Sequence, residues 1–309
     1  AEEDPDCVAY VIPIPYYDKN MDGSFCQMHD ERDQYPDYVP ITKYEDYDFE
    51  ARHPEIIFIH NPYDECNFAT SVHPFFYSKN LKKFTDKLVY IPYFVLDELN
   101  PLDQRAILSM QHFVTVPGVV HADCVVVQSE NMRKQYIEAL TQFAGVNTRD
   151  IWEKKILGLG SPKFDRMRNV NQEKQKVPDE WMKIIQKPDG NKKKVVFYNT
   201  GISALLEHNE KLLEKIKDVL HVFRENQDYV TLLWRPHPLM DTIIKTMRPQ
   251  LREEYQKFVK KYRNEKWGIY DDTVDLDRAM KLSDAYYGDG SSVAILYQKM
   301  NKPLIFQSV

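Results

Sequence analysis

Short runs of apolar residues alternate with amphipathic segments along most of the chain. In the first half, five runs predict buried strands, at residues 7–15, 55–60, 87–95, 122–128 and 155–160. Five more follow at residues 194–199, 229–234, 267–270, 285–287 and 304–306. The segments between them repeat apolar residues at helical spacing, and Ser129 and Ser291 stand where helix N-caps are expected. Strands and helices that alternate in this way are typical of α/β proteins with parallel sheets.

A polar segment over residues 168–193 separates the two series of strands and is rich in Lys, Asn, Gln and Asp. We therefore expect an N-terminal α/β domain over residues 1–167, a linker over 168–193 and a C-terminal α/β domain over 194–309. Each domain is predicted to contain one Rossmann-like parallel sheet, and the two domains are expected to face a cleft. Because the sequence stops directly after a predicted strand, we also expect that C-terminal helices are missing.

Composition narrows the class of protein. The chain has 309 residues and 43% hydrophobic content, which suits a globular protein with a large core. A formal net charge of −6 argues against general nucleic-acid binding, and no apolar run is long enough to span a membrane. The four cysteines are too far apart to indicate a zinc site or a disulfide framework. We expect a cytoplasmic protein that uses neither a metal ion nor another cofactor.

The most informative stretch is DAYYGDGSSVAILYQKMNKPLIF, close to the end of the sequence. Gly288 and Gly290 allow a sharp turn and a close approach of the backbone to a ligand. Ser291 and Ser292 then open a helix whose first N–H groups and dipole favour an anion. We predict that this turn, which also carries Asp289, binds a phosphate. An ordinary serine-capped turn from strand to helix is the alternative.

Two further loops follow predicted strands of the second half, at the strand ends where parallel sheets bind ligands. In WRPHP, Arg235 can clamp an anion with its guanidinium fork, and His237 can donate or transfer a proton. The turn Asn199-Thr200-Gly201 is expected to contribute to the same donor site. A structural role is the alternative for both loops.

The first half has one comparable loop, after the predicted strand at residues 55–60. It carries His60, Asp64 and Glu65, any of which could supply a general base. An ordinary polar turn fits the same residues. The sequence GLGSP at residues 158–162 lacks the third glycine of a dinucleotide-binding fingerprint, so we reject that interpretation.

Taken together and in this order, the motifs resemble those of the CDP-glycerol glycerophosphotransferase family of teichoic-acid polymer synthesis, which has a two-domain GT-B fold. The resemblance covers residues 122–305 and rests on KILGLGSPKFDRM, VVFYNT, the Arg-x-His of WRPHP and SDAYYGDGSSVAILYQKMNKPLIF. It implies that Arg235, His237, Ser291 and Ser292 face the pyrophosphate of an activated donor. His237 matches the family's essential histidine, and Asp289 matches the acid of its Asp-x-Ser-Ser motif.

The first half departs from this family pattern. The family's Trp-His-Gly motif, whose histidine is assigned to catalysis, has no counterpart, and KLVYIPYFV stands where it is expected. His60 is the nearest replacement that the sequence offers, and we treat it as a hypothesis.

The resemblance implies a cytoplasmic transferase, free or at the inner face of the plasma membrane, that acts in cell-surface polymer synthesis. It would move glycerol phosphate or a similar polyol phosphate from a CDP-activated donor to a hydroxyl of a polymer or glycan acceptor. Two alternatives stay open. One is a GT-B glycosyltransferase or nucleotide-sugar epimerase that uses a UDP-sugar, and the other is a non-catalytic nucleotide-binding domain of a larger enzyme.

Overall fold

The computed structural model describes residues 4–170 and 176–309 and divides the chain into two compact units. The first unit runs as far as Ser161 without Phe94–Asp97, and the second takes Phe94–Asp97 and Pro162–Val309. Part of the segment expected to be a linker, residues 171–175, lies outside the described residues. Another part forms α8 (Asp179–Ile185), and its Trp181 is buried in the core of the second unit.

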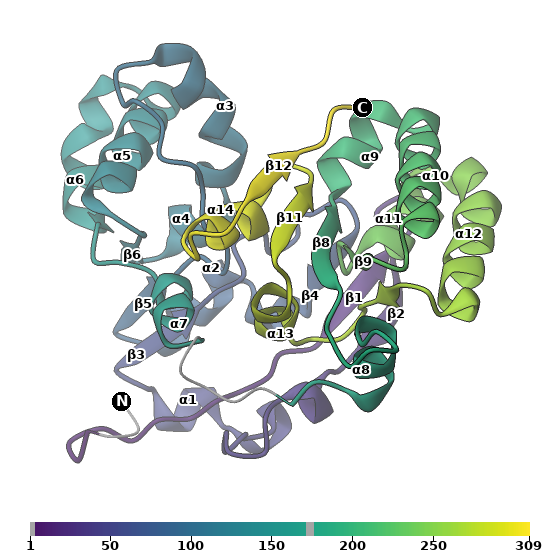
Figure 1. The fold of residues 1–309 in the computed structure, drawn as a ribbon. Helices are drawn as coiled ribbons and strands as arrows, with labels where there is room; N and C mark the ends of the chain where they lie inside the picture. The colour runs from purple at the N-terminus through teal and green to yellow at the C-terminus, as the bar shows by residue number, and fades with distance from the viewer. Residues whose placement is uncertain (1–3, 171–175) are drawn as a thin grey trace. The chain divides into compact units, whose positions relative to one another are not determined.

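The first unit contains a parallel sheet in the order β3-β5-β6-β7 (Figure 1). Its strands are β3 (Ile56–Ile59), β5 (Lys87–Tyr90), β6 (Cys124–Val126) and β7 (Ile156–Leu157). The helices of this unit are α1 (Phe49–Arg52), α2 (Ser78–Leu81), α3 (Gln104–Val114), α4 (Pro117–His121), α5 (Glu130–Ala144) and α6 (Arg149–Lys155). Four of the five strands predicted for the first half are therefore confirmed.

The predicted strand at residues 7–15 is wrong. This segment makes a single isolated bridge, between Val11 and Ile41, and Pro13 and Pro15 leave it with fewer N–H groups for a ladder. A small antiparallel sheet in the order β2-β1-β4, which the apolar pattern did not predict, follows it. Its strands are β1 (Tyr16–Lys19), β2 (Phe25–His29) and β4 (Thr70–Val72).

The second unit contains a five-stranded sheet in the order β10-β9-β8-β11-β12, in which every neighbouring pair is parallel (Figure 1). All five predicted strands of the second series are present, as β8 (Lys194–Thr200), β9 (Val230–Pro236), β10 (Ile269–Tyr270), β11 (Ala285–Gly288) and β12 (Leu304–Phe306). The remaining helices are α7 (Pro162–Val170), α9 (Ile202–His208), α10 (Glu210–Glu225), α11 (Met240–Met247), α12 (Arg252–Glu265), α13 (Leu276–Leu282) and α14 (Ser292–Gln298).

The core of the second unit lies between this sheet and its helices, where Phe197, Leu233 and Tyr286 from three strands meet Tyr297 from α14. An α/β unit with a parallel sheet in each half confirms the predicted fold class. Within the part of the chain that the structure describes, no helix is long and apolar enough to cross a membrane.

Candidate functional site

Three loops meet at the carboxyl edge of the sheet in the second unit, because β9, β8 and β11 are parallel neighbours (Figure 1). The loop after β8 lies between the other two and binds both. The backbone N–H of His237 donates to the carbonyl of Thr200 at 2.9 Å. On the other side, Oδ2 of Asp289 accepts from the N–H of Gly201 at 2.5 Å. The strand order therefore brings all the motifs predicted for the donor site to one edge.

Asn199, at the end of β8, connects the flanking loops with its side chain. Its Nδ2 donates to the carbonyl of Arg235 at 2.9 Å, and its Oδ1 accepts from Ser291 Oγ at 3.2 Å and from Tyr286 OH at 3.3 Å. Asn199 is only 5% exposed, and its side chain is engaged in these contacts. The geometry favours a role in holding the loops over the direct donor contact that the sequence suggested.

Thr200 and Gly288 are also enclosed by protein. Thr200 is fully buried, and its hydroxyl accepts from the indole N–H of Trp234 at 3.2 Å. Gly288 has a φ of +151°, and a Cβ there would lie 2.1 Å from the carbonyl oxygen of Asn199. The close approach that requires this glycine is therefore to the neighbouring strand. Gly290 is exposed, and a Cβ there would meet nothing nearer than 3.9 Å.

Arg235 forms a buried ion pair and does not point its fork at an open site. Its Nη1 donates to Asp271 Oδ2 at 2.5 Å, and its Nη2 donates to the carbonyl of Thr273 at 2.7 Å. Only 7% of Arg235 is exposed. The guanidinium thus ties the end of β9 to the loop after β10, and this geometry favours a positioning role over the anion clamp predicted from the sequence.

His237 presents the opposite case, because one of its ring nitrogens has no partner in the part of the chain that the structure describes. Its Nδ1 accepts from the N–H of Leu239 at 3.1 Å, so in the neutral ring the proton lies on Nε2. Burial lowers the pKa of His237 to about 4. Near neutral pH the unliganded protein therefore carries an uncharged imidazole. Among the described residues no acceptor is found for Nε2–H, which is free to donate to a ligand.

Asp289 is held by both of its carboxylate oxygens. While Oδ2 accepts from Gly201, Oδ1 accepts from Nε2 of Gln307 at 2.5 Å. Gln307 also accepts from Tyr198 OH at 3.0 Å. Partial burial raises the pKa of Asp289. The sequence reasoning missed Gln307, although its position directly after β12, at the same strand edge, could have drawn attention to it.

The two serines of the Gly-Ser-Ser turn differ in their contacts. Ser291 is the N-cap of α14, as predicted, and its Oγ accepts from the N–H of Ala294 at 3.4 Å. Ser292 is half-buried. In the described part of the chain, the backbone N–H groups of Gly290 and Ser292 have no acceptor. Phosphate binding at this turn stays a prediction. The dipole of α14 contributes little to such a site, because the helix has only seven residues.

The family model described as CDP-Glycerol:Poly(glycerophosphate) glycerophosphotransferase matches residues 115–309. The chain belongs to this family. The match confirms the resemblance inferred from the motifs and includes every loop of the second unit described above. No curated protein matches the sequence.

Several solved structures are similar to the chain in fold. The Staphylococcus aureus MnaA–UDP structure has a TM-score of 0.47 at 14% identity, over 84% of this chain and 58% of that chain. A UDP-GlcNAc 2-epimerase from Methanocaldococcus jannaschii, solved with UDP-GlcNAc and UDP, gives 0.47 at 12% identity, over 82% and 59%. A UDP-forming trehalose-phosphate synthase from Burkholderia xenovorans gives 0.39 at 13% identity, over 81% and 58%. The chain thus spans less than two thirds of the length of each of these three structures.

The family match begins at residue 115 and therefore leaves out the loop after β3. His60 is exposed there, and its Nδ1 lies 3.0 Å from the carbonyl oxygen of Ile91. Because a carbonyl can only accept, Nδ1 carries the proton in the neutral ring and Nε2 keeps a free lone pair. His60 can therefore accept a proton from solvent or from a substrate.

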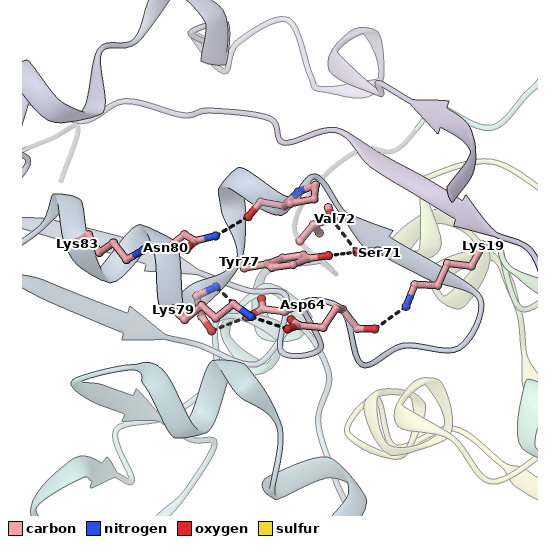
Figure 2. A network of polar contacts seen from close by, with 11 residues as sticks. Lys19, Asp64, Ser71, Val72, Tyr77, Lys79, Asn80 and Lys83 are labelled. Atoms are coloured by element: carbon pink, nitrogen blue, oxygen red, sulfur yellow. Dashed lines mark hydrogen bonds and ion pairs between the residues drawn. The ribbon is translucent and has the colours of Figure 1, made fainter. Parts of the chain in front are cut away.

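The two acids of the same loop are engaged in a polar network (Figure 2). Asp64 is 2% exposed, and its Oδ2 accepts from the N–H and the hydroxyl of Ser78 at 2.8 and 2.6 Å. Burial raises the pKa of Asp64 to about 6. Glu65 pairs with Lys79 at 2.7 Å, and its carbonyl accepts from the buried Lys19. Each acid thus has one carboxylate oxygen engaged by a neighbouring side chain, whereas the ring of the exposed His60 is held only through Nδ1 among the described residues.

Proposed function

We propose that the chain transfers glycerol phosphate, or a similar polyol phosphate, from a CDP-activated donor to a hydroxyl of a polymer or glycan acceptor. Family membership supports this class of reaction. The observation that carries the proposal is the unpartnered Nε2–H of His237 at the strand edge where the family's motifs meet. The same proposal places the reaction in the cytoplasm or at the inner face of the plasma membrane, because a nucleotide-activated donor is used.

The proposed reaction is a phosphoryl transfer with balanced proton and electron movements. The acceptor oxygen attacks the phosphorus of the polyol phosphate, and the bond from that phosphorus to the bridging oxygen breaks. CMP leaves with the bonding electron pair, while the hydroxyl proton passes to a base. No metal ion or other cofactor is invoked for these steps.

His237 is assigned to the leaving group in this proposal. Its Nε2–H donates a hydrogen bond to the phosphate oxygens of CMP, where negative charge increases during transfer. An anion next to the ring would raise the pKa of His237, so the donor-bound state favours the imidazolium more than the unliganded protein does. The N–H groups of Gly290 and Ser292 are candidates for contacts with the same phosphates.

His60 is the candidate base for the acceptor hydroxyl, because its Nε2 is unprotonated in the neutral ring and open to solvent. The other polar residues described at this edge of the second unit position the loops. Asn199, Arg235 and Asp289 hold the three loops together, and the Nε2–H of His237 is left without an acceptor among the described residues.

Two measurements on the 309-residue chain test the proposal. In a thermal-shift panel of CDP-glycerol, CDP-ribitol, CDP and UDP-GlcNAc, we expect the CDP compounds to raise the melting temperature and UDP-GlcNAc to leave it unchanged. With CDP-glycerol and an acceptor, we expect release of CMP. Release of UDP, or epimerisation of the sugar, would favour a UDP-sugar enzyme, and binding without turnover would favour a non-catalytic domain.

A further inference from the structure

A hollow of about 400 Å³ lies between α10 and α12 in the second unit. Its lining comes from the second half of α10, from nearly the whole length of α12, and from Trp267 just before β10. The two helices lie side by side in Figure 1. Since none of its lining residues belongs to the loops of the candidate donor site, the hollow is a separate feature. Its volume falls in the range of small-molecule pockets.

The floor of the hollow is apolar and held in place. Phe258, Tyr262 and Trp267 are each less than a tenth exposed, and Leu220 completes the lining. The hydroxyl of Tyr262 donates to the carbonyl of Leu232 at 2.7 Å, and the indole N–H of Trp267 donates to Glu265 at 3.1 Å. These two bonds hold both rings in place, so the hollow exists before any ligand enters.

The rim of the hollow carries more positive than negative side chains. Its four cations, Lys217, Arg224, Lys257 and Lys261, share only the carboxylates of Glu254 and Glu265. Lys217 pairs with Glu254, while Arg224 and Lys261 both lie near Glu265. Among the described residues, no carboxylate comes within ion-pair distance of Lys257. A chain with a net charge of −6 thus places an uncompensated cation at the mouth of an apolar hollow.

We propose that the hollow between α10 and α12 binds a small amphiphilic anion. The apolar body of the ligand would lie against Phe258 and Trp267, and its carboxylate, sulfonate or phosphate would contact Lys257. A purely apolar ligand would leave Lys257 without an anionic partner. A small anion without an apolar part would leave the aromatic rings exposed to water. The site is independent of the transfer reaction proposed above.

Three matched probes separate these contributions in calorimetric titrations of the 309-residue chain. Decanoate has both parts, decanol lacks the charge and acetate lacks the apolar body. We expect saturable binding of decanoate below its micelle concentration, with at least tenfold weaker binding of decanol and acetate. Decanoate should also change the tryptophan fluorescence, and this change should be lost in Trp267→Phe. Absence of saturable binding, or decanol binding as tightly as decanoate, would overturn the proposal.

A pair of charge reversals on α12 supplies the control. Lys257 and Lys260 are both exposed, but only Lys257 lines the hollow. Lys257→Glu should weaken decanoate binding about five- to tenfold and remove most of its salt dependence, as expected for a surface ion pair. Lys260→Glu should change it less than twofold, and His237→Ala should bind decanoate like the wild type. Equal losses in the two lysine variants would contradict a site at Lys257.

Discussion

Each unit has a histidine just beyond a strand of its parallel sheet, and the two are held by opposite backbone groups. His60 follows β3 and donates from Nδ1 to the carbonyl of Ile91, whereas Nδ1 of His237, which follows β9, accepts from the N–H of Leu239. A carbonyl partner leaves Nε2 as an acceptor, and an N–H partner leaves Nε2 as a donor. The same residue type can therefore act as a base in one unit and as a hydrogen-bond donor in the other.

The surroundings of the two histidines also differ in rigidity. His60 is exposed and held by one hydrogen bond from its ring. His237 is half-buried, and its loop is joined to the loop after β8 by its own backbone and to β10 through Arg235 and Asp271. We therefore expect substitutions at the first histidine to affect activity alone, and substitutions around the second to affect folding as well.

The largest effect is expected for His60→Ala. Loss of a general base typically lowers turnover by about 10² to 10⁴-fold. Because His60 is exposed, the melting temperature should hardly change. His112→Ala removes another exposed histidine of the same unit and should keep full CMP release. Turnover of His60→Ala within a few-fold of the wild type would remove His60 from the mechanism.

Asp271→Ala tests the rigidity of the second region. It leaves the buried guanidinium of Arg235 without its carboxylate, which should cost about 3–5 kcal/mol of unfolding free energy. The neighbouring Asp272→Ala breaks only the exposed pair with Arg263 and should cost less than about 1 kcal/mol. Urea unfolding of both variants measures the difference. Similar losses would show that the Arg235–Asp271 pair does not stabilise this edge of the sheet.

His237→Ala should separate the donor role from folding. Removing a hydrogen-bond donor at developing charge typically costs a factor of about 10² to 10³ in turnover. The half-buried ring of His237 is not part of the core cluster of the second unit, so the melting temperature at pH 7 should fall only slightly. A loss of CMP release that comes with an equally large loss of stability would instead assign His237 to the structure.

The smallest expected effect is on how the free energy of unfolding depends on pH. The folded pKa of His237, about 4, lies below its ordinary value of 6.5, so the unfolded chain takes up a proton first as the pH falls. The resulting stability is complete above pH 6.5 and is lost between pH 6.5 and 4. At 1.36 kcal/mol per pKa unit, it amounts to at most about 3 kcal/mol. Urea unfolding of His237→Gln should show a correspondingly weaker loss over this pH range, and identical profiles would contradict a neutral His237.

Local signals explain why much of the second unit was predictable from the sequence. Its central strands β8 and β9 are continuous apolar runs because both of their faces are buried, and Ser291 caps a helix through a hydrogen bond three residues away. Segments without a one-sided apolar pattern were missed. In β2, Phe25 and Met28 are both exposed, so the small antiparallel sheet gives no clear signal.

The role of Arg235 could not be read from the sequence, because its partner Asp271 is 36 residues away and reaches it only through the pairing of β9 with β10. The same holds for Gln307, which contacts Asp289 because β12 lies beside β11. The sequence motifs identified which loops meet. The strand order determines which of their side chains are engaged in contacts within the protein. The tautomers of the two histidines depend on single backbone contacts that no residue pattern records.

The tautomers of His60 and His237 are the most direct test of the account. Long-range ¹H–¹⁵N NMR spectra of the protein with ¹⁵N-labelled histidine distinguish the two ring nitrogens, and His60→Gln and His237→Gln assign the signals. At pH 7.5 we predict a protonated Nδ1 for the neutral ring of His60. For His237 we predict a neutral ring protonated at Nε2, which stays neutral as the pH is lowered to 5. The same tautomer in both rings, or a His237 that is charged at pH 6, would contradict the assignment of opposite roles.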